Sequence, residues 1–315
     1  MYATKNNKNA ATLDLNKEYS PSKNSKRFLD TADPSKAVIE QFVKSLTEQT
    51  QRANTKHQVR QNVSYRKQCS HSVEGTDNQL VDIYYKDKEY GTPIFVYIHG
   101  GFWQELDKST SGSFVEPLVE RGFRVIAVDY NLCPNVTLAT INEQIKNFFQ
   151  WLYAYAEDTQ ASVISISGHS AGAYLSTLLF SKTLLSLRYA ERTVSLFLIS
   201  GIFDLRECWK LPSVNPNNIW NLDAVSSETL SPITWELDRE FIEFAKQINL
   251  RIYILAGEND SETFKAQSEK YAKKLKGAGL QTEFKIFDGY DHFDIIENVP
   301  RVGSLINTYL LENLS

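Results

Sequence analysis

The sequence predicts an α/β protein with a central, mostly parallel sheet that has helices on both of its faces. Three observations predict this class. Short, continuous runs of β-branched and apolar residues recur along the chain, as expected for strands that are covered on both faces. Helical patterns lie between these runs, which indicates right-handed crossovers. At 315 residues, the chain is also long enough to bury one large core without disulfides or a metal.

The expected strands can be placed in order. "VRQNVSYRKQ" at 59–68 and "QLVDIYYKD" at 79–87 predict an early antiparallel pair. Six further runs predict the rest of the sheet: "PIFVYIHG" at 93–100, "FRVIAVDY" at 123–130, "SVISISGH" at 162–169, "VSLFLIS" at 194–200, "LRIYILAG" at 250–257 and "TEFKIFDG" at 282–289.

Two helices are clear from their apolar spacing. Between about residue 31 and Lys56, Val38, Ile39, Phe42, Val43 and Leu46 recur at helical spacing, and we expect this helix to pack on the outside of the main domain. The clearest helix runs from Leu138 to Ala156 with one apolar stripe.

The organisation of the chain follows from composition. Residues 1–30 are rich in Asn, Lys and Ser, so we expect a flexible tail, followed by a single α/β domain over 31–315. The span 203–249 has no strand run but contains three of the five tryptophans. Because it lies between two strands of the sheet, it predicts a small cap over the carboxyl edge, where open α/β sheets bind ligands.

Composition also limits the possible partners. Cys69, Cys133 and Cys208 are odd in number and have no metal-binding spacing, which favours a reducing compartment and neither disulfides nor a metal site. A net charge of −4 with scattered basic residues indicates neither nucleic acid nor an anionic membrane as partner. No signal peptide or membrane span is evident, so we expect a cytoplasmic protein.

The stretch "ISISGHSAGA", residues 164–173, places Ser170 between a predicted strand and a predicted helix. Glycines at 168 and 172 allow helix and strand to approach closely, so the serine can sit on the sharp turn of a nucleophile elbow. The alternative is a small residue that simply starts a helix. The context of strand, turn and helix favours the nucleophile.

A serine nucleophile needs a base and an acid that follow it in the chain order typical of this elbow. Of the five histidines, only His292 lies beyond Ser170, in the loop after the last predicted strand. For the acid, "LAGENDSETF" offers Glu258 and Asp260, and we favour Asp260 as the group that orients the imidazole. Asp260 could instead cap the following helix, and Asp204 is then the reserve candidate.

The developing oxyanion needs hydrogen-bond donors. "YIHGGFW", residues 97–103, follows a strand, and its glycines let main-chain N–H groups of Gly101 and Phe102 point at a bound oxygen. The N–H of Ala171, the residue after the nucleophile, would complete an oxyanion hole. We expect His99 to anchor this loop by hydrogen bonding.

Together these residues resemble an α/β-hydrolase of the esterase branch, whose oxyanion loop reads His-Gly-Gly-Gly. Here the loop reads "HGGFW" instead, and with "GHSAGA", "SGIFDLR" and "DYNLCP" it resembles the kynurenine formamidases (arylformamidases) over roughly Gln79 to the C-terminus. In the last motif, Cys133 stands where related enzymes carry Ala.

The resemblance implies hydrolysis of N-formyl-L-kynurenine to L-kynurenine and formate in tryptophan breakdown, by a Ser170, His292 and Asp260 triad. A general carboxylesterase acting on aryl or short-chain esters is the alternative. The implied partner is a small aromatic formamide, and no metal or organic cofactor is needed. We expect Trp103, Tyr130 and Tyr174 to provide apolar walls for the substrate ring. Core packing is the alternative for each of them, and a homodimer is left open.

Overall fold

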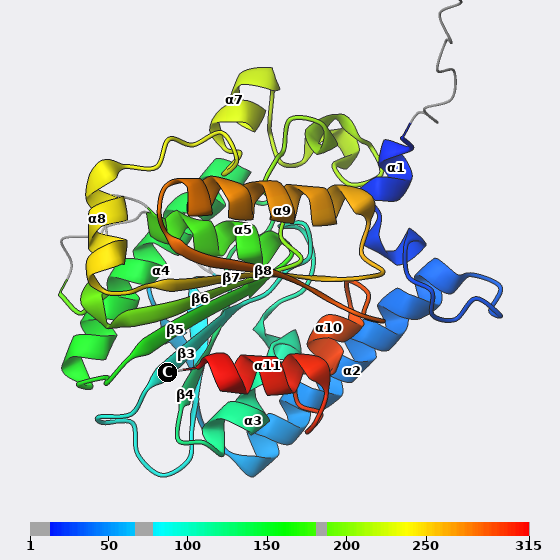
Figure 1. Cartoon of the computed structure of the whole chain (residues 1–315). Coiled ribbons are helices and arrows are strands. Elements are labelled where there is room, and N and C mark those ends of the chain that lie inside the picture. The colour runs from blue at the N-terminus through cyan, green and yellow to red at the C-terminus, as the bar shows by residue number, and fades with distance from the viewer. Residues whose placement is uncertain (1–12, 67–77, 181–187, 315) are drawn as a thin grey trace, which may run out of the picture.

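The computed structural model describes residues 13–66, 78–180 and 188–314. Its centre is an eight-stranded sheet with the order β1-β2-β4-β3-β5-β6-β7-β8 (Figure 1). The strands are β1 (Gln58–Ser64), β2 (Leu80–Tyr85), β3 (Ile94–Ile98), β4 (Arg124–Val128), β5 (Ile164–His169), β6 (Thr193–Ile199), β7 (Arg251–Gly257) and β8 (Gln281–Phe287). β2 pairs antiparallel with both β1 and β4, and all the other pairs are parallel. The predicted sheet class and the early antiparallel pair are therefore confirmed.

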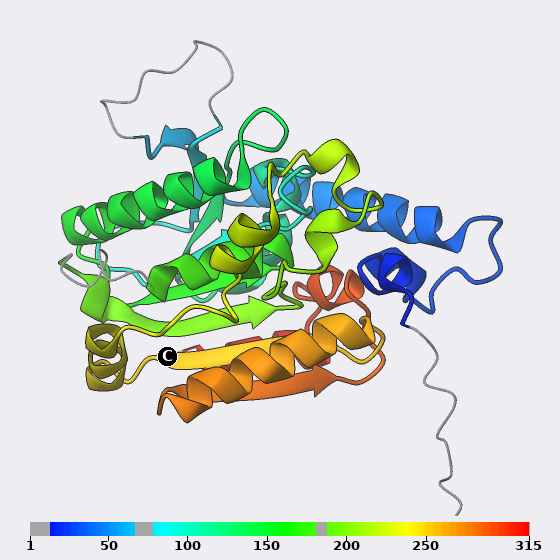
Figure 2. The same ribbon diagram turned by 90° about the horizontal axis from the view of Figure 1, so that it is seen from above.

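Helices cover both faces of this sheet (Figures 1 and 2). They are α1 (Leu15–Glu18), α2 (Pro34–Lys56), α3 (Val115–Val119), α4 (Leu138–Asp158), α5 (Ala171–Ser176), α7 (Ala224–Thr229), α8 (Arg239–Gln247), α9 (Glu262–Gly277), α10 (Asp294–Glu297) and α11 (Leu305–Asn313). One core layer joins the sheet to α4, α5 and α9, and the other joins it to α2, α3, α10 and α11. Among the described residues, no helix combines the length and the apolar composition needed to cross a bilayer.

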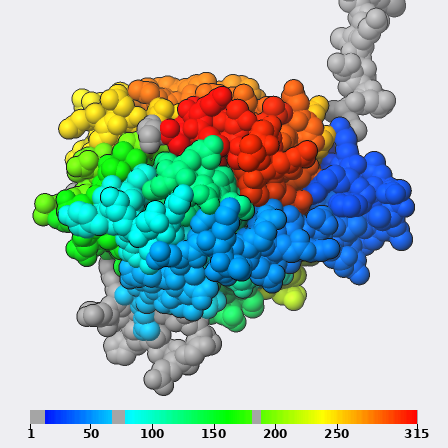
Figure 3. All heavy atoms as spheres, turned by 90° about the horizontal axis from the view of Figure 1, so that it is seen from below, coloured from blue at the N-terminus to red at the C-terminus, as the bar shows by residue number. Residues whose placement is uncertain are grey.

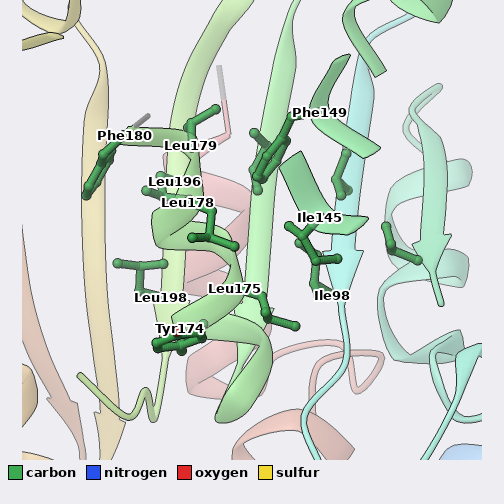
Figure 4. Close-up of a cluster of buried hydrophobic side chains, with 14 of the residues drawn as sticks. Ile98, Ile145, Phe149, Tyr174, Leu175, Leu178, Leu179, Phe180, Leu196 and Leu198 are labelled. Carbon is green, nitrogen blue, oxygen red and sulfur yellow. The ribbon is translucent and has the colours of Figure 1, made fainter. Parts of the chain in front are cut away.

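The central strand β3 shows why both faces must be covered. Ile94, Val96 and Ile98 point into one core layer, while Phe95 and Tyr97 point into the other, because successive side chains of a strand alternate between faces. Figure 4 shows the first of these layers, in which Ile98 lies among apolar side chains of α4, α5 and β6. A strand with two buried faces reads as a continuous apolar run in the sequence.

Capping residues set the starts of the long helices. The Asp33 carboxylate accepts a hydrogen bond from the Lys36 N–H at 3.0 Å, and Pro34 occupies the first helical position of α2. Thr137 Oγ1 accepts from the Thr140 N–H at the start of α4. Both helices were predicted, and their starts follow ordinary capping chemistry.

The segment before α2 corrects the expected tail. Residues 1–12 lie outside the described residues, but from residue 13 onward the chain forms α1 and a 3₁₀ turn, Pro21–Lys23. Tyr19 is 1% exposed, and Arg27 forms ion pairs with residues near the C-terminus. A few strong anchors fix this polar segment, although the average composition of residues 1–30 indicated disorder.

The insertion between β6 and β7 contains α7, α8 and two 3₁₀ turns, Cys208–Lys210 and Pro216–Asn218. Figure 2 views the molecule from the side of α7; the part of this segment that includes α7 lies over the middle of the domain, and α8 lies at one edge. Buried Trp220 donates from Nε1 to the Phe102 carbonyl at 3.0 Å, and Gln104 donates to the Val214 carbonyl at 2.8 Å. The insertion thus holds the loop that follows β3.

The strand order creates a natural crevice beside β3. From β3 the chain crosses to β4 on one side, and it later enters β5 on the other side of β3. Loops that leave such a pair of strands diverge, and ligands of open α/β sheets bind between them. Ile98 pairs with Gly168 at the carboxyl ends of these two strands, so the loops beginning at residues 99 and 170 start side by side.

Candidate active site

Ser170 occupies the turn between β5 and α5 in a strained main-chain conformation, with φ 54° and ψ −118°. A Cβ added at Gly172 would lie 2.0 Å from the Ile98 carbonyl oxygen, and one at Gly168 would lie 2.1 Å from the Gly172 oxygen. Neither clash can be relieved by moving a flexible side chain. The two glycines therefore permit the close approach of helix and strand that presents the serine at the sheet edge.

Ser170 lines a pocket of about 260 Å³ together with His292. The walls are mostly apolar. Besides Ser170 and His292 the lining comprises Tyr19, Ser20, Pro21, Ser22, Ile39, Phe42, Val43, Gly101, Phe102, Gln104, Glu105, Leu106, His169, Ser213, Val214 and Phe293. A pocket with apolar walls and a few convergent polar groups is the usual form of a small-molecule site.

His292 is paired with Asp260. Its Nδ1 lies 3.1 Å from each Asp260 carboxylate oxygen, and both side chains are buried. Ser261 rather than Asp260 caps α9, since its hydroxyl accepts from the Phe264 N–H. The carboxylate of Asp260 is therefore directed at the imidazole.

The other candidate acids have different partners. Glu258 accepts from the Gly289 N–H at 2.8 Å. Asp204 pairs with the Arg206 guanidinium at 2.9 and 2.6 Å, and this bonding lowers the carboxyl pKa although burial acts to raise it. Of the three acids, only Asp260 contacts His292.

In this structure no hydrogen bond joins the Ser170 hydroxyl to His292, although the two residues line the same pocket. Nucleophile and base often stand further apart in a free enzyme and approach when substrate binds. Since Nδ1 faces the carboxylate, Nε2 is the imidazole nitrogen available to the serine.

The loop after β3 has an unusual main-chain path. Gly101, Phe102 and Trp103 have φ values of 101°, 49° and 60°. A Cβ on Gly101 would lie 2.1 Å from the Glu105 carbonyl oxygen, so only glycine fits the turn. The tight turn leaves Gly101 and Phe102 on the pocket wall, next to Ser170.

Ala171 is the first residue of α5, where main-chain N–H groups have no partner within the helix. His99 Nδ1 lies 2.8 Å from the Gly100 carbonyl oxygen, and the imidazole stacks on Tyr130 at 4.4 Å between ring centroids. His99 therefore contacts the loop as expected from the sequence.

The three expected substrate-binding aromatics do not line the pocket, and this prediction was wrong. Trp103, Tyr130 and Tyr174 are each 0% exposed. Trp103 packs edge-on against Tyr174 and Trp220, and Figure 4 shows Tyr174 beside Leu175 and Leu198 in the core. Tyr174 also accepts a hydrogen bond from Asn142 Nδ2 at 2.8 Å. Their proximity to the catalytic motifs in sequence reflects core packing behind those motifs.

The pocket walls come instead from parts of the chain without a catalytic motif. Tyr19 to Ser22 form one wall, and Ile39, Phe42 and Val43 of α2 form another. Ile39 and Val43 belong to the apolar pattern that predicted this helix, and their exposed fractions are 47% and 37%. The apolar stripe of α2 is wider than its contact with the sheet requires. These extra apolar residues were the one feature of the sequence that could have indicated a pocket wall on α2.

His169, the residue before Ser170, also lies in the pocket wall. Its Nε2 donates to the His292 carbonyl oxygen at 2.8 Å, and the two imidazole centroids are 4.7 Å apart. Burial, together with the neighbouring His292, lowers the pKa of His169 well below its usual value. His169 is therefore neutral, with Nε2 as the protonated nitrogen. The described residues include no group of three or more His, Cys, Asp or Glu side chains suited to a metal ion.

Comparisons with known proteins give the class first. The BD-FAE family matches residues 81–204. A Silicibacter sp. protein assigned provisionally as a thioesterase has a TM-score of 0.69 at 22% identity, covering 94% of this chain and 98% of that one. Esterase B of Lactobacillus rhamnosis has a TM-score of 0.62 at 17% identity, covering 88% and 93%. The fold is that of the α/β-hydrolases.

Curated relatives then give the family. This chain is 39% identical to a kynurenine formamidase of Drosophila melanogaster over 96% of its own length and 97% of that protein. It is 30% identical to the kynurenine formamidase of Salmo salar, covering 91% and 90% of the two chains. The chain belongs to the kynurenine formamidase family.

Proposed function

We propose that this protein hydrolyses N-formyl-L-kynurenine to L-kynurenine and formate, with Ser170 as nucleophile, His292 as base and Asp260 as the orienting acid. One observation carries the proposal. In a chain of this family, Ser170 and His292 line one pocket, while both Asp260 oxygens lie 3.1 Å from the far nitrogen of the imidazole.

The first half of the reaction follows from this arrangement. His292 keeps the proton on Nδ1 because Asp260 accepts it, so Nε2 can take the proton of the Ser170 hydroxyl. The serine oxygen attacks the formyl carbon. Main-chain N–H groups of Gly101, Phe102 and Ala171 stabilise the oxyanion that forms.

The second half releases both products. Protonated His292 gives its proton to the aniline nitrogen, which leaves as L-kynurenine while Ser170 holds the formyl group as an ester. Water then attacks this ester with His292 as base, and formate leaves. The proton passes from serine to amine and from water back to serine, so the enzyme is regenerated.

The substrate fits the pocket by its chemistry. The apolar walls suit the aromatic ring, since a ring buried there leaves water. Among the described residues lining the pocket, Glu105 carries the only carboxylate. We place the α-ammonium group of the substrate next to it.

A carboxylesterase acting on aryl or short-chain esters is the second candidate. The mostly apolar pocket and the esterases among the structural neighbours favour it. The same triad cleaves both bond types, so the substrate must be tested directly.

The deciding experiment compares the purified protein and Ser170→Ala on N-formyl-L-kynurenine and on phenyl acetate. We expect kcat/KM to be much higher for the formamide, and the variant to lose about 10⁴-fold or more. If only phenyl acetate is cleaved, the proposed triad stands but N-formyl-L-kynurenine is not the substrate. Full activity in the variant would reject the nucleophile.

Further properties belong to this proposal. We place the protein in the cytoplasm, in tryptophan breakdown, without nucleic acid as partner. Burial raises the pKa of the Cys133 thiol to about 12, and Cys208 is also a buried free thiol, which fits a reducing compartment.

A further inference from the structure

The N-terminal segment, residues 13–27, is attached to the part of the molecule that carries Asp260. Glu18 accepts from the Thr263 N–H at 2.8 Å in the first turn of α9. Gln267, one turn further along α9, donates to the Tyr19 hydroxyl at 2.8 Å. Figure 3 shows this dark blue segment packed beside the orange and red C-terminal part of the chain.

The same segment reaches the residue immediately before His292. Arg27 Nε donates to Asp291 Oδ2 at 2.9 Å, and the Ser25 hydroxyl donates to the same oxygen at 2.5 Å. Asp291 is 1% exposed. A buried carboxylate with charge-assisted partners has a fixed position, because losing them would leave its charge unpaired.

The other oxygen of Asp291 holds the turn that contains His292. Oδ1 accepts from the N–H groups of Phe293 and Asp294, both at 2.8 Å. The carboxylate of Asp291 therefore joins the N-terminal segment on one side to the main chain around His292 on the other.

Arg27 also binds the far end of this turn. Its guanidinium donates to the two oxygens of Glu297 at 3.1 and 3.2 Å. In the described part of the chain, the ion pairs of Asp291, Asp294 and Glu297 all run to Arg27. One cation thus ties together the two ends of the segment 291–297.

We propose that Arg27 is a positioning residue, which acts through Asp291 to hold His292 in line with Ser170. Three elements then fix the base. Asp260 orients the imidazole, His169 binds the carbonyl of His292, and Arg27 fixes the preceding residue. The inference rests on the proposed role of His292 and applies to any acyl substrate.

The test compares Arg27→Gln with Arg60→Gln. Arg60 is a matched control, since it pairs with Glu89 at 3.2 and 2.9 Å on the edge strand β1, outside the pocket lining. Activity on N-formyl-L-kynurenine and on phenyl acetate is expressed per active site, counted by titrating Ser170 with a fluorophosphonate. Thermal unfolding is recorded for every variant.

We expect Arg27→Gln to lower kcat per titrated site about tenfold on each substrate that the parent protein cleaves, with KM within twofold, because small displacements of a catalytic group are costly. Arg27→Lys keeps the charge and should recover most of the loss. Arg60→Gln should match the parent protein.

Three results would overturn the inference: kcat within twofold of the parent in Arg27→Gln, a change confined to KM, or equal losses in Arg27→Lys and Arg27→Gln. If Arg27→Gln does not fold, Ser25→Ala removes one donor to Asp291 and should lower kcat in the same direction. An unchanged kcat in that variant would equally reject the inference. If the parent protein cleaves only phenyl acetate, the proposed substrate is wrong. The comparison of Arg27→Gln with Arg60→Gln can then still be made on phenyl acetate.

Discussion

The two sides of the pocket are built in different ways. On one side, Ser170, His292 and the Gly101 loop each follow a strand, and main-chain geometry places them. On the other side, the N-terminal segment and α2 are placed by side-chain contacts, such as that of Ser25 with Asp291, 266 positions apart. The difference suggests that the two sides have different roles in the proposed reaction. In the function proposed above, the strand-end side carries the bond-breaking chemistry, and the other side shapes the space for the substrate and supports the base.

The largest effect expected within the strand-end side is that of Asp260→Asn. The amide can no longer hold His292 in the tautomer that leaves Nε2 free, so kcat should fall by about 10³–10⁴-fold. The matched control is Asp204→Asn, which removes an acid that follows the neighbouring strand but pairs with Arg206. Turnover numbers on N-formyl-L-kynurenine test this, and comparable losses in both variants would contradict the assignment.

A medium effect is expected at His169. In His169→Phe the carbonyl of His292 loses its donor, and we expect kcat to fall about tenfold and the free energy of unfolding to fall by about 1–3 kcal/mol. His169→Gln keeps a donor group and should lose less of both. Kinetics and urea unfolding measure the two quantities. Equal behaviour of the two variants would mean that the hydrogen bond has no role in holding the base.

The strand-end side of the pocket is the part of the site that could be predicted from sequence. The strand-end residues lie within short motifs whose local chemistry is explicit: a serine between Gly168 and Gly172, two glycines after β3, and a histidine after β8. The parallel sheet then brings them to one edge without further information. The fold class and the family resemblance were therefore accessible from local patterns.

The opposite wall could not be predicted in this way. Tyr19 and Arg27 lie in a polar segment, and their partners are on α9 and in the turn around His292. No local pattern links residues so far apart. The prediction for the aromatic residues failed for a related reason. Trp103 and Tyr174 lie next to the predicted catalytic motifs in the sequence, but their side chains point into the core behind those motifs.

A smaller effect is expected at Glu105, on the loop that follows β3. Glu105→Gln removes the carboxylate that we place near the substrate ammonium. Because exposed ion pairs contribute at most about 1 kcal/mol, KM for N-formyl-L-kynurenine should rise about fivefold. Formanilide has the same scissile bond but no ammonium, so its KM should not change. Glu40→Gln, a neighbour of Ile39 with a side chain 67% exposed, is the charge control. Equal changes for both substrates would exclude an ammonium contact.

The smallest effect concerns the pH dependence of stability at Asp294, one of the acidic residues that pair with Arg27. Burial, with the negative charge of Asp291, raises the pKa of Asp294 to about 7. The folded state then keeps a proton on Asp294 that the unfolded state has already lost above about pH 4. Stability contributed by this group therefore falls as pH rises from about 4 to about 7, and it stays low above that.

Asp294→Asn removes this titration while keeping an oxygen that can accept from the Asp291 N–H, a bond of 2.7 Å in the structure. As pH rises from 5 to 8, we expect the variant to gain on the order of 1 kcal/mol in free energy of unfolding relative to the parent protein, a reduced value because the Asp294 side chain is 18% exposed and solvent screens part of the interaction. Urea unfolding at the two pH values measures this, with Asp87→Asn in an exposed loop as control. A gain that is the same at both pH values would show that Asp294 does not titrate in this range, so that the negative charges of the turn are already balanced by Arg27.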